Sequence, residues 1–544
     1  MNKNLPYLVL ISLLVGFFSI AVEARTLEYN FSIKSDHLSV KLCTIGNDSG
    51  STKFLCPLII GMDNDQDTNI ETEIAGISKN ITLEGDYLTL THQPRDKICL
   101  TSKLHNFQTE PNLYFYLLKD NFVMFGSYVL FLLQDAEEQL HKVIFTWDNY
   151  QQNIISNFWQ STLKSSFTVQ ASNTTLSHSF FIGGSFNTCN IAANNCAVSQ
   201  LIFFADFPLA QQPIISDLQK IQNSHNNFFQ DTGYTKSRDY YIFLSDHKHP
   251  AVSTGFRQNG GNFSYQAMSL GANLTPLQVQ SIIAHEHLHK WLGGIIRQDL
   301  SMQEYNAWFI EGITDYYTGY FNYQSGLWSL EDYLTIYNNC LYRYFSSPNH
   351  IVSSEDISRN WQSFQYISYL RGNIIGHELD YQLRQATNNK YNFDIYVQYL
   401  NKIAKNNSAF KFSTDSFNST IKELTGYNAN DFIQHNIIGS KLSVKASKIL
   451  DGKAVLIFKK MPVADYGFDQ FHSFLNWQLT GVDENSKGYK EGLRNGWRIL
   501  SIWEPQHDNK FITLRIKNNN AIKTIKFIPE YKEMLIPQYI SMRQ

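Results

Sequence analysis

The segment "IIAHEHLHKWLGG", residues 282–294, places three histidines and a glutamate within five residues. His285 and His289 are four residues apart, so in a helix both imidazoles project from one face, about one turn apart. Glu286 follows the first histidine. The pattern is H-E-x-x-H, in which the two histidines bind zinc and the glutamate acts as general base for the attacking water. The alternative is an ordinary amphipathic helix whose histidines pack or face solvent.

A zinc hydrolase needs a third protein ligand, and the segment "SMQEYNAWFIEGITDYYTGY", residues 301–320, offers Glu311. Ser301 and Glu304 predict a capping box at the start of this second helix. The spacing between the motifs allows a short loop and antiparallel packing of the two helices, and Gly312 leaves out a side chain where helices approach. The sequence therefore predicts a Zn²⁺ site formed by both histidines and Glu311.

The helix that carries the first motif has clear limits in the sequence. Thr275 predicts the N-cap, Pro276 suits the first helical position, and Gln278 completes a capping box. Gly293 and Gly294 predict the end of the helix. These signals place both histidines in its last turns.

Asp315 lies four residues after Glu311, on the same helical face. Its carboxylate can accept a hydrogen bond from the outer ring nitrogen of a zinc-binding histidine and so fix the tautomer. A solvated aspartate is the other interpretation, and the sequence leaves both open.

The two motifs together, "HEHLHKW" and "WFIEGITDYYTGY", resemble the gluzincin metallopeptidases. The resemblance is specifically to the glycyl aminopeptidase family, whose pattern is H-E-x-x-H-x-W followed by W-x-x-E-G-x-T-x-Y-Y. It implies a thermolysin-like catalytic domain, a zinc cofactor and a peptide or protein substrate. Besides the H-E-x-x-H residues, the residues that match this pattern are Trp291 of the first motif and Trp308, Glu311, Gly312, Thr314, Tyr316 and Tyr317 of the second.

The segment "YISYLRG", residues 366–372, resembles the Y-x-K-G segment of gluzincins, where a tyrosine hydroxyl reaches the tetrahedral intermediate. The resemblance implies this role for Tyr369, with Tyr366 as the second choice. A preorganised hydroxyl there adds to the stabilisation of a developing oxyanion. The chain has 31 tyrosines, so a packing role is the competing interpretation.

The family also carries G-G-L-E-H on a strand before the zinc helix, where the backbone binds substrate and the glutamate can meet a free amino terminus. Here the sequence is "NGGNFSYQAMSLG", and the resemblance points to Gly260 and Gly261 as residues that bind the substrate backbone. Asn262, Phe263 and Ser264 stand where the other three residues would be. Peptide hydrolysis is therefore expected, but the carboxylate that would anchor a free amine is missing.

The 544 residues predict a multidomain α+β protein. Alternating apolar and polar residues predict an antiparallel β domain over 25–197, which resembles the N-terminal domain of the family. A mostly helical, thermolysin-like domain is expected over 198–450. The tail, 455–535, resembles the second half of a PDZ domain through G-L-x-x-G-x-x-I-L-x-I, and "FLNWQLTGV" is expected to be a strand. The matching tail residues are Gly492, Leu493, Gly496, Ile499, Leu500 and Ile502.

The N-terminus predicts export. Lys3 precedes an apolar run that ends near Val22, and Val22 and Ala24 suit a cleavage site, so residues 1–24 are expected to be a signal peptide. A retained membrane anchor is the alternative. The net charge of -3 and the lack of a basic cluster give no reason to expect nucleic acid or an anionic membrane as a partner. The protein is therefore expected to be periplasmic or secreted, and its oligomeric state is left open.

Six cysteines do not form a metal motif or a dense disulfide scaffold. Pairing of Cys189 with Cys196 is the favoured local disulfide. For the other four, disulfides and buried thiols remain equal alternatives. Their positions are Cys43, Cys56, Cys99 and Cys340.

Two functions remain after these observations. The first is a zinc peptidase, and the second is a non-catalytic exported protein that binds peptides through the cleft and the PDZ-like domain. The complete set of metal ligands, general base and tyrosine favours the peptidase, because a binding protein has no need of a general base.

Overall fold

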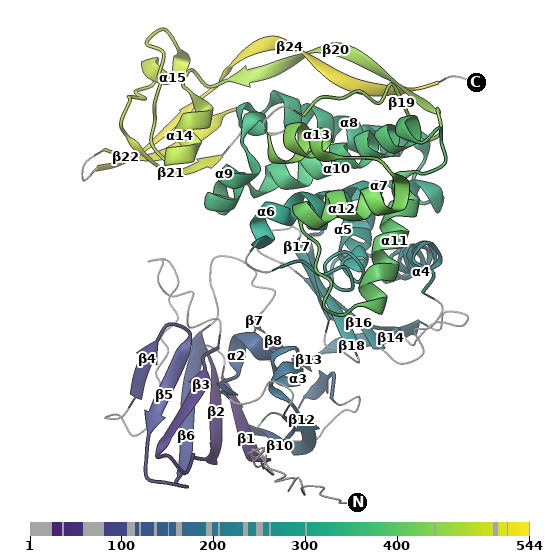
Figure 1. Ribbon diagram of the computed structural model, residues 1–544. Helices are drawn as coiled ribbons and strands as arrows, with labels where there is room; N and C mark the ends of the chain where they lie inside the picture. The colour runs from purple at the N-terminus through teal and green to yellow at the C-terminus, as the bar shows by residue number, and fades with distance from the viewer. Residues whose placement is uncertain are drawn as a thin grey trace, which may run out of the picture. The chain divides into compact units, whose positions relative to one another are not determined.

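A computed structural model describes residues 24–34, 37–57, 81–105, 115–118, 121–134, 139–148, 150, 152–158, 166–191, 199–204, 207–231, 238–245, 254–259, 263–299, 302–439, 442–503, 510–518 and 521–542. The expected signal peptide, except Ala24, lies outside them. The chain forms two compact units, Met1–Ser185 and Phe186–Gln544 (Figure 1). No helix of the described part is both long and apolar enough to cross a membrane.

The first unit consists of β-sheets, as the alternating sequence predicts. Its largest sheet has the order β12-β10-β1-β2-β6, and all pairs are antiparallel except the parallel pair β1 and β10. In β1 every second residue is buried, namely Leu27, Tyr29 and Phe31, because successive side chains of a strand point to opposite faces. The strands of this sheet are β1 Thr26–Ile33, β2 His37–Ile45, β6 Lys97–His105, β10 His141–Asp148 and β12 Ser166–Ala171.

Two smaller sheets complete the unit, with the orders β4-β5-β3-β9 and β11-β13-β8-β7. Their strands are β3 Ser51–Leu55, β4 Ile81–Glu84, β5 Tyr87–Thr91, β9 Leu132–Leu133, β7 Phe115–Leu118, β8 Asn121–Phe125, β11 Asn153–Ser156 and β13 Phe180–Gly184. Two short helices are α2 Gly126–Val129 and α3 Asn173–Ser177.

One disulfide of the first unit joins two paired strands. Cys43 and Cys99 lie opposite each other on β2 and β6 and form a disulfide. Cys56 and Cys340 are buried thiols. The favoured pairing of Cys189 with Cys196 lies outside the described residues, because Cys196 and the side chain of Cys189 are not among them.

The second unit begins with a five-stranded sheet of order β14-β15-β16-β18-β17. Strands β15, β16 and β18 are parallel, whereas β17 pairs antiparallel with β18 and forms an edge. Strand β14 pairs with β15, so residues that the sequence assigned to the end of the β domain belong to this sheet. The strands are β14 Phe186–Ile191, β15 Ser199–Phe204, β16 Arg238–Ser245, β17 Thr254–Asn259 and β18 Phe263–Leu270, with α4 Gln211–Phe228 between β15 and β16.

Helices make up the middle of the second unit and share one apolar core. Helix α11, Phe393–Asn406, shows why: Phe393, Val397, Leu400 and Ala404 recur at helical spacing and are all buried. The other helices are α5 Pro276–Leu288, α6 Gln303–Ala307, η3 Trp308–Ile313, α7 Thr314–Gln324, α8 Leu330–Ser346, η4 Pro348–Ile351, α9 Ser354–Arg359, α10 Trp361–Ala386, α12 Thr414–Thr425, α13 Asn430–Phe432 and η5 Ile433–Ile438.

The C-terminal part contains two three-stranded sheets, β19-β20-β24 and β21-β22-β23, the second with its own apolar core. The expected strand at residues 474–482 is wrong, because Gln470–Asn476 forms helix α14, capped by Asp469, and the rest of this described segment contains only an isolated bridge of Gln478 with Arg498. Gly492 and Gly496 have φ of 108° and 84°, which favour glycine. The elements are β19 Lys448–Ile449, β20 Ala454–Asp465, α15 Lys487–Lys490, β21 Arg498–Trp503, β22 Ile512–Asn518, β23 Ala521–Phe527 and β24 Glu530–Ser541.

Candidate active site

Helix α5 begins as its sequence predicts. Thr275 is the N-cap, Pro276 opens the helix, and Thr275 and Gln278 form the expected capping box. The end differs from the prediction, because the helix stops at Leu288 with His289 as its C-cap, before the two glycines. The amide of Lys290 bonds the carbonyl of His287, three residues back, which tightens the last turn.

The second motif lies on a helix with a mixed backbone. Helix α6 starts at Gln303 with Met302 as its N-cap and no side-chain cap, so the expected cap by Ser301, which lies outside the described residues, does not fit this start. A π-helical segment, η3, follows and contains Glu311, and α7 continues from it. Single π-turns inserted in helices are often found at functional sites.

The three expected metal ligands converge. Nε2 of His285 lies 3.1 Å from Nε2 of His289, and Oε2 of Glu311 lies 3.3 Å and 3.4 Å from these two nitrogens. In a tetrahedral zinc site with bonds of about 2.0–2.1 Å, ligand atoms are about 3.3–3.4 Å apart. The three atoms therefore have the spacing of one face of a zinc tetrahedron.

The outer nitrogens fix which imidazole atoms face this point. Nδ1 of His285 donates to Oδ1 of Asp315 at 2.7 Å, and Nδ1 of His289 donates to the carbonyl of Leu292 at 3.1 Å. Both acceptors require a proton on Nδ1, which leaves the Nε2 lone pairs of the neutral rings directed at Glu311. Three electron-rich atoms that face one another require a positive charge between them.

The electrostatics favour the same conclusion. Burial lowers the pKa of His285, but Asp315 and Glu311 outweigh burial and raise this pKa well above its usual value. Burial raises the pKa of Glu311, yet the two histidines outweigh it and hold the pKa low. A cation such as Zn²⁺ can replace the protons that would otherwise sit on the imidazoles. The residues present fit a zinc ion.

Glu286 lies beside the ligands without replacing one. Its carboxylate is within 4.8 Å of the histidine nitrogens, whereas Glu311 contacts both of them more closely. The side chain is buried, and its Oε2 has no hydrogen-bond partner among the described residues. Burial raises the pKa of Glu286 even though His289 and His285 oppose the shift. An unpartnered carboxylate with a raised pKa is suited to accept a proton.

The structure brings Tyr369, but not Tyr366, to this site. The ring of Tyr369 stacks on that of His285, with 6.0 Å between the centroids. The pKa of Tyr369 is raised, first by burial and then by the neighbouring Glu311 carboxylate, so the hydroxyl keeps its proton and can donate it in a hydrogen bond. Tyr366 instead contacts Ser347 and Asn349.

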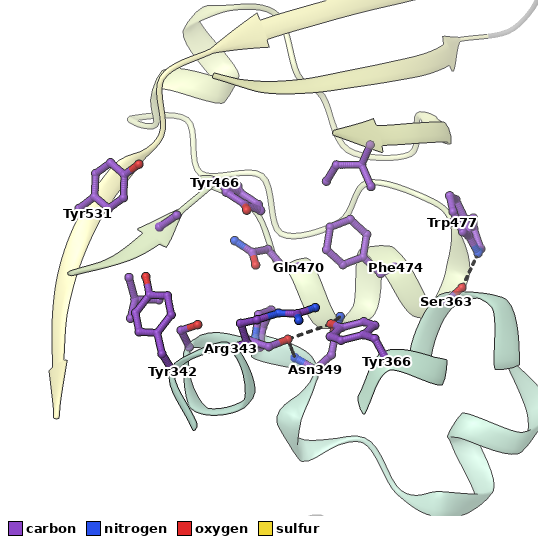
Figure 2. Close-up of a pocket in the computed structure, with 16 residues that line it drawn as sticks. Tyr342, Arg343, Asn349, Ser363, Tyr366, Tyr466, Gln470, Phe474, Trp477 and Tyr531 are labelled. Carbon is purple, nitrogen blue, oxygen red and sulfur yellow. Dashed lines mark hydrogen bonds between the residues drawn. The ribbon is translucent and has the colours of Figure 1, made fainter. Parts of the chain in front are cut away.

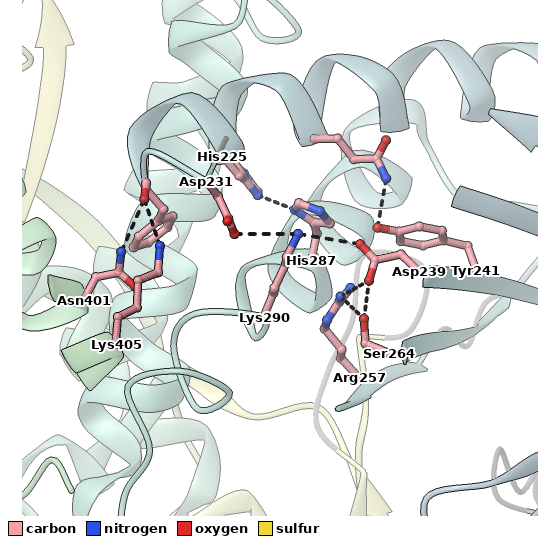
Figure 3. Close-up of polar contacts among 12 residues, drawn as sticks. His225, Asp231, Asp239, Tyr241, Arg257, Ser264, His287, Lys290, Asn401 and Lys405 are labelled. Atoms are coloured by element: carbon pink, nitrogen blue, oxygen red, sulfur yellow. Dashed lines mark hydrogen bonds and ion pairs between the residues drawn. The ribbon is translucent and has the colours of Figure 1, made fainter. Parts of the chain in front are cut away.

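A buried polar network beside the C-terminal end of α5 was not predicted from the sequence (Figure 3). Nζ of Lys290 lies 3.7 Å from Asp239 and 4.0 Å from Asp231, and Asp239 also accepts from Arg257 at 2.9 Å. Burial raises the pKa of Asp239, but Arg257 and Lys290 outweigh it and lower this pKa. These ion pairs connect the C-terminal end of α5 to β16 and β17. No local pattern marks the four residues, since they lie far apart in the chain.

His287, the third histidine of the motif, belongs to the same buried region. Its Nδ1 lies 2.8 Å from Nδ1 of His225 on α4, so one imidazole donates and the other accepts. Burial lowers the pKa of both, that of His225 to about 3, and both rings are neutral. His287 therefore packs α5 against α4 and does not face the metal site.

The expected substrate-backbone residues, Gly260 and Gly261, lie outside the described residues. Ser264, which stands at the last position of the G-G-L-E-H pattern, is buried on β18 and donates a hydrogen bond to Asp239. The strand that forms the edge of the sheet and packs against α5 is β17, residues 254–259. Its sequence, "TGFRQN", contains no carboxylate.

Comparisons with known proteins agree with this geometry. Residues 278–398 match the model of the M61 glycyl aminopeptidase family. The fold is similar to that of an aminopeptidase N family protein from Idiomarina loihiensis, with 12% identity, a TM-score of 0.66, and coverage of 94% of this chain and 98% of that one. An M1 zinc metallopeptidase from Deinococcus radiodurans has 12% identity and a TM-score of 0.45 over 77% of this chain and 95% of its own.

Legionella pneumophila aminopeptidase A has 10% identity and a TM-score of 0.46 over 95% of this chain and 56% of its own. No curated protein matches this chain. The family match over the metal-site helices, together with the shared aminopeptidase-like fold, supports a peptidase of the gluzincin type.

Proposed function

We propose that this protein is a zinc-dependent peptidase in which His285, His289 and Glu311 bind the metal. The observation that carries the proposal is the convergence of three electron-rich atoms 3.1–3.4 Å apart, two from the end of α5 and one from η3. Asp315 acts by holding His285 in the tautomer that binds metal. A zinc ion bound there supplies Lewis acidity, which polarises the scissile carbonyl and makes water a better nucleophile.

The protein side chains then divide the proton transfers and the charge stabilisation. Glu286 accepts the proton of the attacking water at its free Oε2 and delivers it to the leaving amine. The Tyr369 hydroxyl donates a hydrogen bond to the oxygen that becomes negative when the peptide carbonyl is attacked. Its raised pKa suits this role, because a phenol that keeps its proton remains a donor.

The edge strand β17 is proposed to bind the substrate backbone by strand addition, in place of the two glycines that follow it. The comparisons favour aminopeptidase activity, and we propose it as one mode of this enzyme. Because β17 has no carboxylate, we also propose that a free amino terminus is not strictly required.

Export and a peptide-binding tail complete the proposal. The Cys43–Cys99 disulfide supports an oxidising compartment and therefore a periplasmic or secreted enzyme. The separate core of the tail and the positive φ of Gly492 and Gly496 support a PDZ-like domain over residues 455–535.

The test combines metal analysis with one conservative variant. The purified protein should contain one zinc per chain and should lose peptide hydrolysis after chelation, with recovery on adding zinc. Glu286→Gln should keep the zinc but lose most of the hydrolysis, because an amide cannot accept the proton. Near-normal turnover of this variant, or full zinc occupancy in His289→Ala, would contradict the proposal.

A further inference from the structure

A pocket of about 670 Å³ lies between the helices next to the metal site and the C-terminal part of the same unit (Figure 2). Helices α8, η4 and α10 line one side, and β20 and α14 line the other. Hydrogen bonds join the two sides: the Tyr342 hydroxyl donates to the carbonyl of Pro462 at 2.7 Å, and Nε1 of Trp477 donates to Ser363 at 2.8 Å. The pocket is therefore bounded by connected elements.

The lining of this pocket combines aromatic rings with one positive charge. Tyr466, Phe474 and Trp477 come from the C-terminal part. Among the lining residues that the structure describes, Arg343 is the only charged one, and no ion pair of Arg343 occurs within the described part of the chain. Figure 2 shows its guanidinium among these side chains. A positive, partly apolar pocket complements a carboxylate that has an apolar neighbour.

The pocket is next to the proposed catalytic residues. Ser363 and Tyr366 of α10 line it, and Tyr369 follows one turn later on the same side of the helix. Arg343 also lines a smaller pocket of about 150 Å³, together with Asp315, the residue that holds His285. Arg343 therefore borders both pockets, and the larger one is lined by the turn of α10 that precedes Tyr369.

We propose that this pocket binds the carboxyl-terminal end of the peptide substrate, with Arg343 as the residue that recognises its carboxylate. The inference rests on the proposed peptidase function. Every peptide with an unblocked C-terminus carries a negative charge on its terminal carboxylate. This carboxylate belongs to the fragment that gains a new amino group when the bond is cleaved. The guanidinium fork binds such a carboxylate through two hydrogen bonds.

The spacing limits the length of peptide that can use the site. From Tyr369 to Ser363, α10 rises about 9 Å at about 1.5 Å per residue, and an extended peptide covers about 3.3 Å per residue. The carboxylate should therefore lie about two to four residues beyond the scissile bond. Short peptides gain from Arg343, and long ones pass beyond it.

The test compares zinc-loaded wild type with Arg343→Gln and with a matched control, Arg359→Gln. Arg359 is an exposed arginine of α9 that pairs with Glu355 and does not line the pocket. Substrates are short peptides of one sequence that end in a free carboxylate or a carboxamide. Wild type and the control should favour the free acid about tenfold in kcat/KM, which corresponds to about 1.4 kcal/mol. Arg343→Gln should lose this preference, because its cleavage of the free acid slows relative to that of the carboxamide.

Further substrates identify the source of the carboxylate. A second pair of carboxamide peptides ends in Glu or in Gln. Faster cleavage of the Glu peptide would show that a side-chain carboxylate can replace the terminal one. This difference in rate should also disappear in Arg343→Gln. The preference should weaken at high salt and in long peptides. Equal rates for free acid and carboxamide in wild type, or a preference that survives in Arg343→Gln, would overturn the proposal.

A binding measurement separates this inference from the proposed function. Titration of fluorescent free-acid and carboxamide peptides into Glu286→Gln, with and without Arg343→Gln, reports recognition without turnover. If wild type cleaves no peptide but the Arg343-dependent difference in affinity is present, the peptidase proposal fails and the pocket assignment stands. If peptides are cleaved and neither measurement depends on Arg343, the pocket assignment fails alone.

Discussion

Gly312 and Gly372 bring the backbones of η3 and α10 into direct contact. A Cβ atom on Gly312 would lie 2.5 Å from Cα of Gly372, and a Cβ on Gly372 would collide with the carbonyl of Trp308. Gly312 follows Glu311, and Gly372 lies one turn after Tyr369. The glycine contact therefore sets the distance between the proposed third ligand and the proposed catalytic hydroxyl.

Gly372→Ala should destabilise the fold and weaken the metal site together. The methyl group meets backbone atoms, which cannot rotate away, so overpacking should cost about 2 kcal/mol or more, above the gain in helix propensity of about 1 kcal/mol. Urea unfolding and zinc titration measure the two effects. The control is Ser419→Ala, which changes an exposed residue of α12. Wild-type stability and zinc affinity in Gly372→Ala would mean that the helices can separate without consequence.

Asp315→Ala should lower zinc affinity about 10- to 100-fold, because Nδ1 of His285 loses the acceptor that fixes its tautomer. Asp315→Asn should have a smaller effect, since the amide oxygen still accepts this hydrogen bond. Competition with a chromogenic chelator measures the affinities. Glu331→Ala removes an exposed carboxylate from α8 and should leave them unchanged. Equal affinities in all four proteins would leave Asp315 as a solvated residue.

Tyr369→Phe should lower kcat by about 10- to 1000-fold with little change in KM, because the hydroxyl is proposed to act mainly in the transition state. Tyr366→Phe is the informative comparison. Its hydroxyl contacts Ser347 and Asn349 in the pocket, so this variant should alter KM rather than kcat. Steady-state kinetics with one short peptide separates the two results. A change confined to KM in Tyr369→Phe would show that Tyr369 only packs.

The buried carboxyl of Glu378 should make the free energy of unfolding depend on pH. The buried carboxyl accepts hydrogen bonds from the amides of Lys445 and Ala446, but burial dominates and raises its pKa to about 7. Because the folded pKa lies above the unfolded one, this contribution to stability is complete below about pH 4.5 and is lost as the pH rises to about 7. The loss amounts to about 3 kcal/mol.

The measurement is the difference in unfolding free energy between wild type and Glu378→Gln from pH 4 to pH 8. An amide keeps the acceptor oxygen but does not titrate, so other groups largely cancel. Wild type should lose stability relative to the variant as the pH rises. A difference that stays constant with pH would place the carboxyl in a solvated environment.

N-acetylated peptides should be cleaved at rates within about tenfold of those of the free peptides, a difference of about 1.4 kcal/mol. The reason is the absence of a carboxylate from β17, since a buried ammonium without a partner is costly. Matched acetylated and free peptides test this in a single kinetic series. If acetylation abolishes cleavage, a carboxylate outside β17 must bind the amine.

Features that depend on neighbours within about one helical turn could be predicted from the amino-acid sequence. The capping box of Thr275 and Gln278 and the common face of His285 and His289 follow from hydrogen bonds and spacing inside one segment. The alternating burial of β1 follows in the same way from the geometry of a strand. Local chemistry was therefore enough to identify the proposed metal helix and the β unit.

Features that depend on residues far apart in the chain could be seen only in the three-dimensional fold. Sheet pairing placed Cys43 beside Cys99, and it made β17 an edge strand of its sheet. Pairing of Lys290 with Asp239 is likewise invisible in the sequence. The ion pair arises because burial of a charge requires a partner, and only the packing of distant segments determines which partner is near.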